Sequence, residues 1–171
     1  MERIWNATAV PGRMAVGETV GAAEPPAGAA SIVRGVVRLL ASLDYRPLSE
    51  FPLPDGRRAD IAGVDPRGGF VIVEVKSSVA DFRADGKWPH YRVWCDAFFF
   101  AVDPDFPQAL LPEDAGLIVA DRYAGAIVRP APVAVLAAAR RRALLLRFAR
   151  TAAGRLAAVS DPEMVRSEPG R

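Results

Sequence analysis

Cysteine and histidine are nearly absent from the sequence: Cys95 and His90 are the single residue of each kind among 171. One cysteine excludes an intramolecular disulfide. One cysteine and one histidine also cannot form a Cys/His zinc site within the chain. A metal bound by this chain is therefore expected to be held by carboxylate and carbonyl oxygens, a donor set that favours Mg²⁺, Mn²⁺ or Ca²⁺.

Long apolar runs are missing as well. No segment approaches the roughly 18 apolar residues needed to span a membrane, and the N-terminal sequence MERIWNATAV lacks the basic region and apolar stretch of a signal peptide. A cytoplasmic protein without membrane contact is expected. Apolar residues make up 51% of the chain and charged residues 25%, which is typical of a globular protein.

Acidic residues are absent between Asp121 and Asp161, a stretch in which arginine recurs. A one-sided basic segment suggests an anionic partner, and nucleic acid is the usual one. On a helix, Arg140, Arg147 and Arg150 fall within an arc of roughly 80°, so we expect them to contact a DNA backbone. The alternative is a solvated helix face in an arginine-rich protein.

The hydrophobic pattern predicts a mixed α/β domain. Helices are expected at 31–44, at 78–96, where Pro89 interrupts the helix or starts a second piece, and at 133–158. Strands are expected at 46–53, 57–64, 69–76, 97–102, 116–120 and 125–129. The third strand, which contains FVIVEVK, should be central and buried on both faces. The Ala-, Gly- and Pro-rich residues 1–29 indicate a flexible leader and residues 159–171 a flexible tail, which leaves 30–158 as the domain.

Two acidic residues fall inside apolar strand patterns, where solvated charges are not expected. If the loop 65–69 closes an antiparallel hairpin, Asp60 lies opposite Glu74, and directly opposed residues share one face of a sheet. Lys76 shares that face because it follows Glu74 by two positions on one strand. Opposed carboxylates repel each other and are costly to desolvate, so a metal ion or the Lys76 ammonium should offset them.

A third carboxylate extends this row. The preceding hairpin, centred on Asp55, places Glu50 opposite Asp60, although a bulge in its turn would move Glu50 to the other face. The predicted metal site thus comprises Asp60, Glu74 and Glu50. The alternative is a salt bridge between Lys76 and one acid, which would leave the second carboxylate unpaired.

Asp60, followed on the next strand by Glu74-Val75-Lys76, resembles the motif of the PD-(D/E)XK nuclease superfamily, with Ala59 in place of the proline. The segments RRADIAGV, IVEVKSSVADFRADGKWPHYRVWCDAFFFAV and LLPEDAGLIVADRYAGAIVRPAP are similar to those of the MmcB-like DNA repair proteins of bacteria. The resemblance covers roughly residues 31–158. It implies a restriction-endonuclease-like fold, in which helices flank a mixed sheet.

The resemblance also implies a Mg²⁺- or Mn²⁺-dependent deoxyribonuclease. Asp60 and Glu74, with the carbonyl oxygen of Val75, would hold one or two ions, and Lys76 would orient or activate the attacking water and stabilise charge on the phosphate. Many relatives carry an acid in the first helix, whereas residues 31–43 have none here. Glu50 is the candidate replacement, or the site is incomplete.

Some superfamily members place a Gln-x-x-x-Tyr element on the helix after the core. Lys87 and Tyr91 have this spacing, and residues four apart share one face of an α-helix, so both are predicted to lie near DNA. The alternative is a surface lysine and a half-buried tyrosine. Asp81 and Asp85 are interpreted as solvated helix charges.

The functional prediction is a DNA repair endonuclease that binds DNA and hydrolyses phosphodiester bonds. A homodimer and repair-protein partners are further expectations. The alternatives are a non-catalytic DNA-binding or adaptor module that keeps the nuclease fold, and a structural interaction protein.

Overall fold

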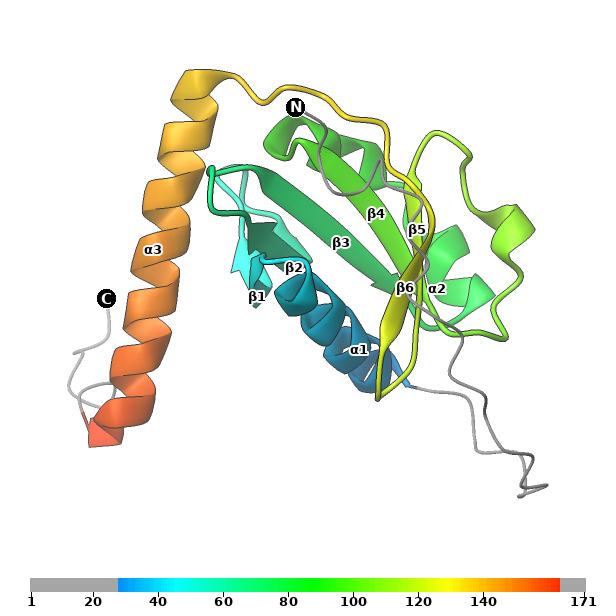
Figure 1. Ribbon diagram of the computed structural model, residues 1–171, viewed down its shortest axis with the longest axis horizontal. Coiled ribbons are helices and arrows are strands. Elements are labelled where there is room, and N and C mark those ends of the chain that lie inside the picture. The colour runs from blue at the N-terminus through cyan, green and yellow to red at the C-terminus, as the bar shows by residue number, and fades with distance from the viewer. Residues whose placement is uncertain (1–27, 164–171) are drawn as a thin grey trace.

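The computed structural model describes residues 28–163, which form a six-stranded mixed sheet flanked by helices (Figure 1). The strands lie in chain order: β1 (Arg46–Pro52), β2 (Arg58–Val64), β3 (Phe70–Lys76), β4 (Ala97–Val102), β5 (Gly116–Ala120) and β6 (Gly125–Arg129). The first three are antiparallel, β3 to β5 are parallel, and β6 is antiparallel to β5. The predicted fold class, a mixed sheet flanked by helices, is confirmed.

Helices cover both faces of this sheet. On one face, α1 (Ala29–Ser42) packs its buried side chains on an aliphatic core that includes Val71 and Val73. On the other face, α2 (Val79–Ala84) and the 3₁₀ helix η2 (Trp88–Trp94) cover a core rich in aromatic rings. The remaining elements are η3 (Gln108–Leu110) and the long helix α3 (Ala138–Ser160), which stands beside β1 and β2 (Figure 1).

The central strand β3 is buried along its whole length, as its apolar sequence predicts. Its side chains alternate between the two cores: Phe70 and Ile72 join the aromatic core, whereas Val71, Val73 and Val75 join the aliphatic one. By the same alternation, Glu74 and Lys76 follow Phe70 and Ile72 onto the aromatic face. Two charged side chains are thereby placed beneath α2 and η2.

Helix α1 is in close contact with the β5–β6 turn. A Cβ atom at Gly35 would lie 2.1 Å from the carbonyl oxygen of Asp121, so only glycine fits at this crossing. Three residues later, Arg38 donates hydrogen bonds of 3.0 Å to the carbonyl oxygens of Arg122 and Tyr123. These contacts fix α1 over the β5 and β6 side of the sheet.

Helix α3 begins five residues later than predicted, at Ala138 rather than near 133. Residues 131–137 are extended because the N–H groups of Ala134 and Leu136 bond to the main-chain and side-chain oxygens of Asp96. At its other end α3 continues through Ser160, two residues into the predicted tail, and breaks at Asp161, whose helical conformation is disfavoured by the following Pro162.

Residues 164–171 of that predicted tail, and residues 1–27 of the predicted leader, lie outside the described residues. Within residues 28–163, no helix combines the length and apolar character needed to cross a membrane.

Candidate functional site

Asp60 and Glu74 lie together where the β2–β3 ladder ends. The register pairs Val64 with Phe70 and Ala62 with Ile72, as predicted, and its last pair is Ile61 with Val73. Beyond that pair the side chains provide the cross-strand bonds. The Asp60 N–H donates to Glu74 Oε1 at 3.3 Å, and the Val75 N–H donates to Asp60 Oδ2 at 2.8 Å. The predicted proximity of the two acids is therefore present in the structure.

Burial disfavours the ionised form of both carboxyl groups. Glu74 is only 4% exposed. This burial, together with the negative charge of Asp60, raises the pKa of Glu74 to about 8. Burial also raises the pKa of Asp60, although the hydrogen bond from the Val75 N–H opposes the shift. In the metal-free protein near neutral pH, the pair consequently carries less than two negative charges.

Lys76 is buried on the same face, but its ammonium lies against Asp81 of α2 and Asp85, the residue that follows α2. Lys76 Nζ lies 2.5 Å from Asp85 Oδ2 and 4.0 Å from Asp81 Oδ1. Burial alone raises the pKa of Asp85, but the hydrogen bonds from Lys76 and from the Lys87 N–H outweigh it, so the pKa of Asp85 lies below its usual value. The interpretation of Asp85 as a solvated charge was wrong, because its side chain is only 17% exposed.

Glu50 lies near the pair but points elsewhere. The pairs Ser49–Ile61 and Phe51–Ala59 confirm the predicted register on both sides of it. Between them Glu50 adopts a left-handed conformation, with φ of 51°, and its carboxylate forms an ion pair with Arg58. Its charge still adds to burial in raising the pKa of Asp60. Within residues 28–163, no three Asp, Glu, His or Cys side chains gather closely enough to hold a metal ion.

The donors at Asp60 and Glu74 nevertheless fit a hard divalent cation. Both are carboxylates, and both are destabilised as anions by burial. The nearby ammonium of Lys76 is bonded to Asp85. Mg²⁺ and Mn²⁺ are commonly bound by one or two carboxylates, with water and substrate oxygens completing the shell. These two residues, with the carbonyl oxygen of Val75 as the predicted third donor, are thus suited to hold such an ion.

Lys87 and Tyr91 do not share one helix face, contrary to the prediction. Tyr91 lies in the 3₁₀ helix η2, with Lys87 as its N-cap. Residues four apart in a 3₁₀ helix are separated by about 120° rather than stacked. Tyr91 is buried, stacks on Phe98 with ring centroids 6.2 Å apart, and donates to the Arg58 carbonyl oxygen at 3.2 Å. It therefore connects η2 to the start of β2, whereas Lys87 is exposed.

The three arginines predicted to contact DNA have different surroundings on α3. All three are exposed, but Arg140 also donates to the Val93 carbonyl oxygen at 2.8 Å and lies over the Trp94 ring. Arg155, which the sequence pattern did not single out, donates to the carbonyl oxygens of Ser49 and Glu50. This interaction places the last turns of α3 beside the candidate site.

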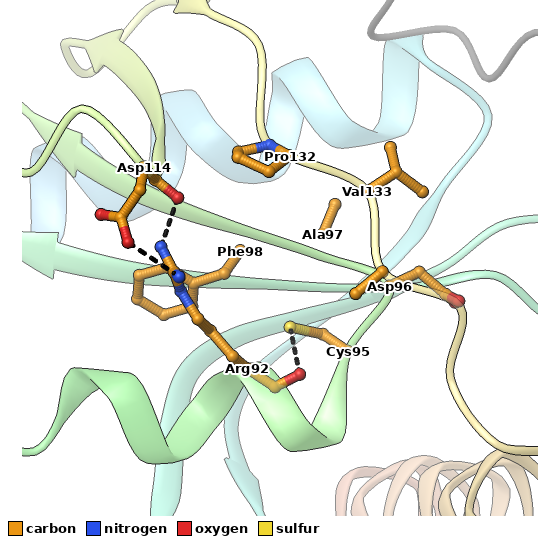
Figure 2. Close-up of a pocket in the computed structure, with 9 residues that line it drawn as sticks. Arg92, Cys95, Asp96, Ala97, Phe98, Asp114, Pro132 and Val133 are labelled. Atoms are coloured by element: carbon orange, nitrogen blue, oxygen red, sulfur yellow. Dashed lines mark hydrogen bonds and ion pairs between the residues drawn. The ribbon is translucent and has the colours of Figure 1, made fainter.

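A small surface pocket lies elsewhere, at the start of β4 (Figure 2). Its lining includes Cys95, Ala97 and Pro132, and Arg92 reaches across it to Asp114 (Figure 2). The Arg92–Asp114 ion pair measures 2.9 Å, and Cys95 is buried. The charged groups that line this pocket already have partners, Arg92 with Asp114 and Asp96 with Arg141, so they offer little to a ligand.

Comparisons with known proteins agree with the resemblance to the MmcB-like family. The sequence model of the family described as DNA repair protein MmcB-like matches residues 18–163. A solved structure of a protein of unknown function from Silicibacter pomeroyi shares 47% identity, with a TM-score of 0.76 over 79% of this chain and 92% of that chain. No protein of curated function matches. The chain belongs to the MmcB-like DNA repair protein family.

Proposed function

We propose that this protein is a metal-dependent deoxyribonuclease of the PD-(D/E)XK type acting in DNA repair. The observation that carries the proposal is the hydrogen-bonded pair of half-buried Asp60 and buried Glu74 at the end of a ladder, with buried Lys76 two residues beyond Glu74. Two adjoining carboxylates whose pKa values burial raises are costly to a fold when both are ionised. A cation-binding role explains them, and the family's link to DNA repair supports a nucleic-acid substrate.

In this proposal Asp60 and Glu74, with the Val75 carbonyl oxygen, hold a divalent ion, Mg²⁺ or Mn²⁺. When bound, that ion supplies Lewis-acid polarisation of the scissile phosphodiester. Lys76 provides a positive charge at the same face, which would stabilise charge that develops on the phosphate or orient the attacking water. The exposed cations Lys87, Arg147 and Arg150 supply backbone contacts that orient the DNA.

One observation favours a second function, a non-catalytic DNA-binding or adaptor module. Helix α1 carries no acidic residue, and Glu50, the candidate replacement, pairs with Arg58 instead. A site reduced to two carboxylates is the composition expected if the fold is retained for binding alone. Salt-sensitive DNA binding without cleavage would identify this case.

The decisive experiment compares wild type, Asp60→Asn and Lys76→Met for Mn²⁺ binding by calorimetry and for cleavage of duplex, single-stranded, flap and abasic DNA. Asp60→Asn should abolish both, because it removes a proposed metal ligand. Lys76→Met keeps the apolar stem, so Mn²⁺ binding should survive while cleavage falls on the order of 10²-fold or more. Wild-type protein that binds DNA but neither takes up Mn²⁺ nor cuts would establish the adaptor function instead.

A further inference from the structure

Several carboxylates surround Lys76 and compete for its ammonium. Among the buried charged side chains of residues 28–163, Lys76 is the only cation. Carboxylates that could receive its ammonium lie on two sides: Asp60 and Glu74 on the sheet, and Asp81 and Asp85 on α2 and its C-cap. An ammonium that paired with Asp60 or Glu74 would neutralise the anionic site that a metal ion requires. The structure resolves this competition in favour of Asp85, at 2.5 Å.

Asp85 is held in place to accept that hydrogen bond. Its second carboxylate oxygen accepts the Lys87 N–H at 3.0 Å, and its own N–H donates to the Phe82 carbonyl oxygen at 3.2 Å. Phe82 in turn packs edge-on against Phe100 of β4, with ring centroids 5.6 Å apart. Asp85 is thereby fixed relative to the sheet, and the position of the Lys76 ammonium follows from it.

Asp81 is a much weaker competitor for the same ammonium. It lies 4.0 Å from Lys76 Nζ, its side chain is 45% exposed, and it also accepts the Ser77 N–H. Because exposed ion pairs are worth little, Asp81 cannot hold Lys76 as Asp85 does. The two residues carry the same charge on one short segment, which makes Asp81 a matched control.

We infer that Asp85 is a positioning residue for the metal site. It draws the Lys76 ammonium away from Asp60 and Glu74 and leaves those two carboxylates available to a divalent cation. The same hydrogen bond orients Lys76 for its role toward the phosphate. This inference rests on the proposed function, since it requires that Asp60 and Glu74 bind a metal.

The test is a double-mutant cycle with Mn²⁺ alone as the probe, followed by calorimetry. In Asp85→Asn the released ammonium should pair with Glu74 or Asp60, so that Mn²⁺ binds on the order of tenfold more weakly. Asp81→Asn removes the same charge and should change the affinity by less than about threefold. Lys76→Met added to Asp85→Asn removes the competing ammonium and should restore the affinity to within about threefold of wild type. Asp85→Glu, which keeps the carboxylate, should bind as wild type does.

Two results would overturn the inference. Equal Mn²⁺ affinity in Asp85→Asn and Asp81→Asn would mean that only generic charge matters. A double variant as weak as Asp85→Asn would mean that Asp85 attracts or binds the metal directly. If Asp85→Asn does not fold, as judged by circular dichroism, Asp85→Ser replaces it in the cycle because its hydroxyl can still accept the Lys87 N–H. A wild-type protein that takes up no Mn²⁺ refutes the proposed function itself, and these outcomes are thus distinguishable.

Discussion

The carboxyl group of Glu74 has an unusual position for an acid, because it lies in a strand whose seven side chains are all buried. Its partner across the ladder is a second acid, Asp60, rather than a base. Lys76, two residues along, is directed to Asp85. At the scale of single residues, the site therefore combines two adjoining acids, of which Glu74 is buried, with a nearby cation whose direct ion pair is to Asp85.

Stability of the metal-free protein should depend on pH through Glu74. Its pKa is about 8 in the folded state against an ordinary 4.5. Because the folded-state pKa is raised, the stabilisation is fully present below about 4.5 and is lost progressively as pH rises toward 8. Glu74→Gln has no charge to desolvate, so its melting temperature in EDTA should change less between pH 5 and pH 9 than that of wild type.

Mn²⁺ should offset the loss of stability that wild type, more than Glu74→Gln, undergoes at high pH in EDTA. Ligation requires the ionised carboxylate, so Mn²⁺ should stabilise the wild type increasingly as pH rises and leave Glu74→Gln almost unchanged. For the prediction in EDTA, a melting temperature that changes equally with pH in wild type and Glu74→Gln would show that Glu74 does not carry the raised pKa.

Among the elements, α3 is a basic helix of which only one side packs on the domain. Leu144 is its one buried residue, and Leu145 and Phe148 pack against the aromatic core. Arg155 bonds to the backbone of β1 beside Glu50. The exposed cations Arg147 and Arg150 are thereby carried on a helix that runs alongside the candidate site.

We expect Arg147→Glu and Arg150→Glu together to weaken DNA binding at any sequence. The double variant should also bind with a shallower salt dependence, by about one unit of slope for each phosphate that the protein no longer touches. Arg34→Glu makes the same type of charge change on α1, on the other face of the sheet, and should alter binding less. Fluorescence anisotropy across a salt series measures both quantities. A salt slope equal to that of wild type would show that α3 presents only a solvated face.

At the scale of the whole molecule, one buried acid connects segments that are far apart in sequence. Asp96, which is 1% exposed, accepts hydrogen bonds from the Phe70 N–H at 2.7 Å and the Leu136 N–H at 3.0 Å. Its two carboxylate oxygens also receive the guanidinium of Arg141, each at 2.7 Å. This network joins the start of β3, the start of β4 and the beginning of α3.

Asp96→Asn should therefore destabilise the entire domain, because removing one partner of a buried ion pair costs roughly 3–5 kcal/mol. For a domain of this size the melting temperature should fall on the order of 10 °C. Asp103→Asn is the matched control: Asp103 is also buried but accepts a bond from the nearby Asp105 N–H, which an amide oxygen can replace. Similar losses in both variants would contradict a special role for the Asp96–Arg141 pair.

Much of the fold and the centre of the site could be predicted because they depend on local patterns. Short turns join β1 to β2 and β2 to β3, so the pairing of these strands follows from the turn positions and from side-chain alternation. That reasoning correctly predicted that Asp60 and Glu74 lie close together and that β3 is buried on both faces. The sequence by itself thus determined the register of the two hairpins formed by β1, β2 and β3, and the position of the acidic pair.

Only the tertiary structure decided which partner each charged group takes. Lys76 and Asp85 are 9 residues apart, Leu136 and Asp96 are 40, and Arg155 and Glu50 are 105. No periodicity relates such positions, because the interactions depend on how α2, η2 and α3 pack on the sheet. Glu50 shows the same limit: its pairing register was predictable, but its left-handed backbone and its ion pair with Arg58 were not. Strand periodicity relates neighbours along and across a ladder, whereas the pairing of a buried charge is determined by the packing of elements from the whole domain.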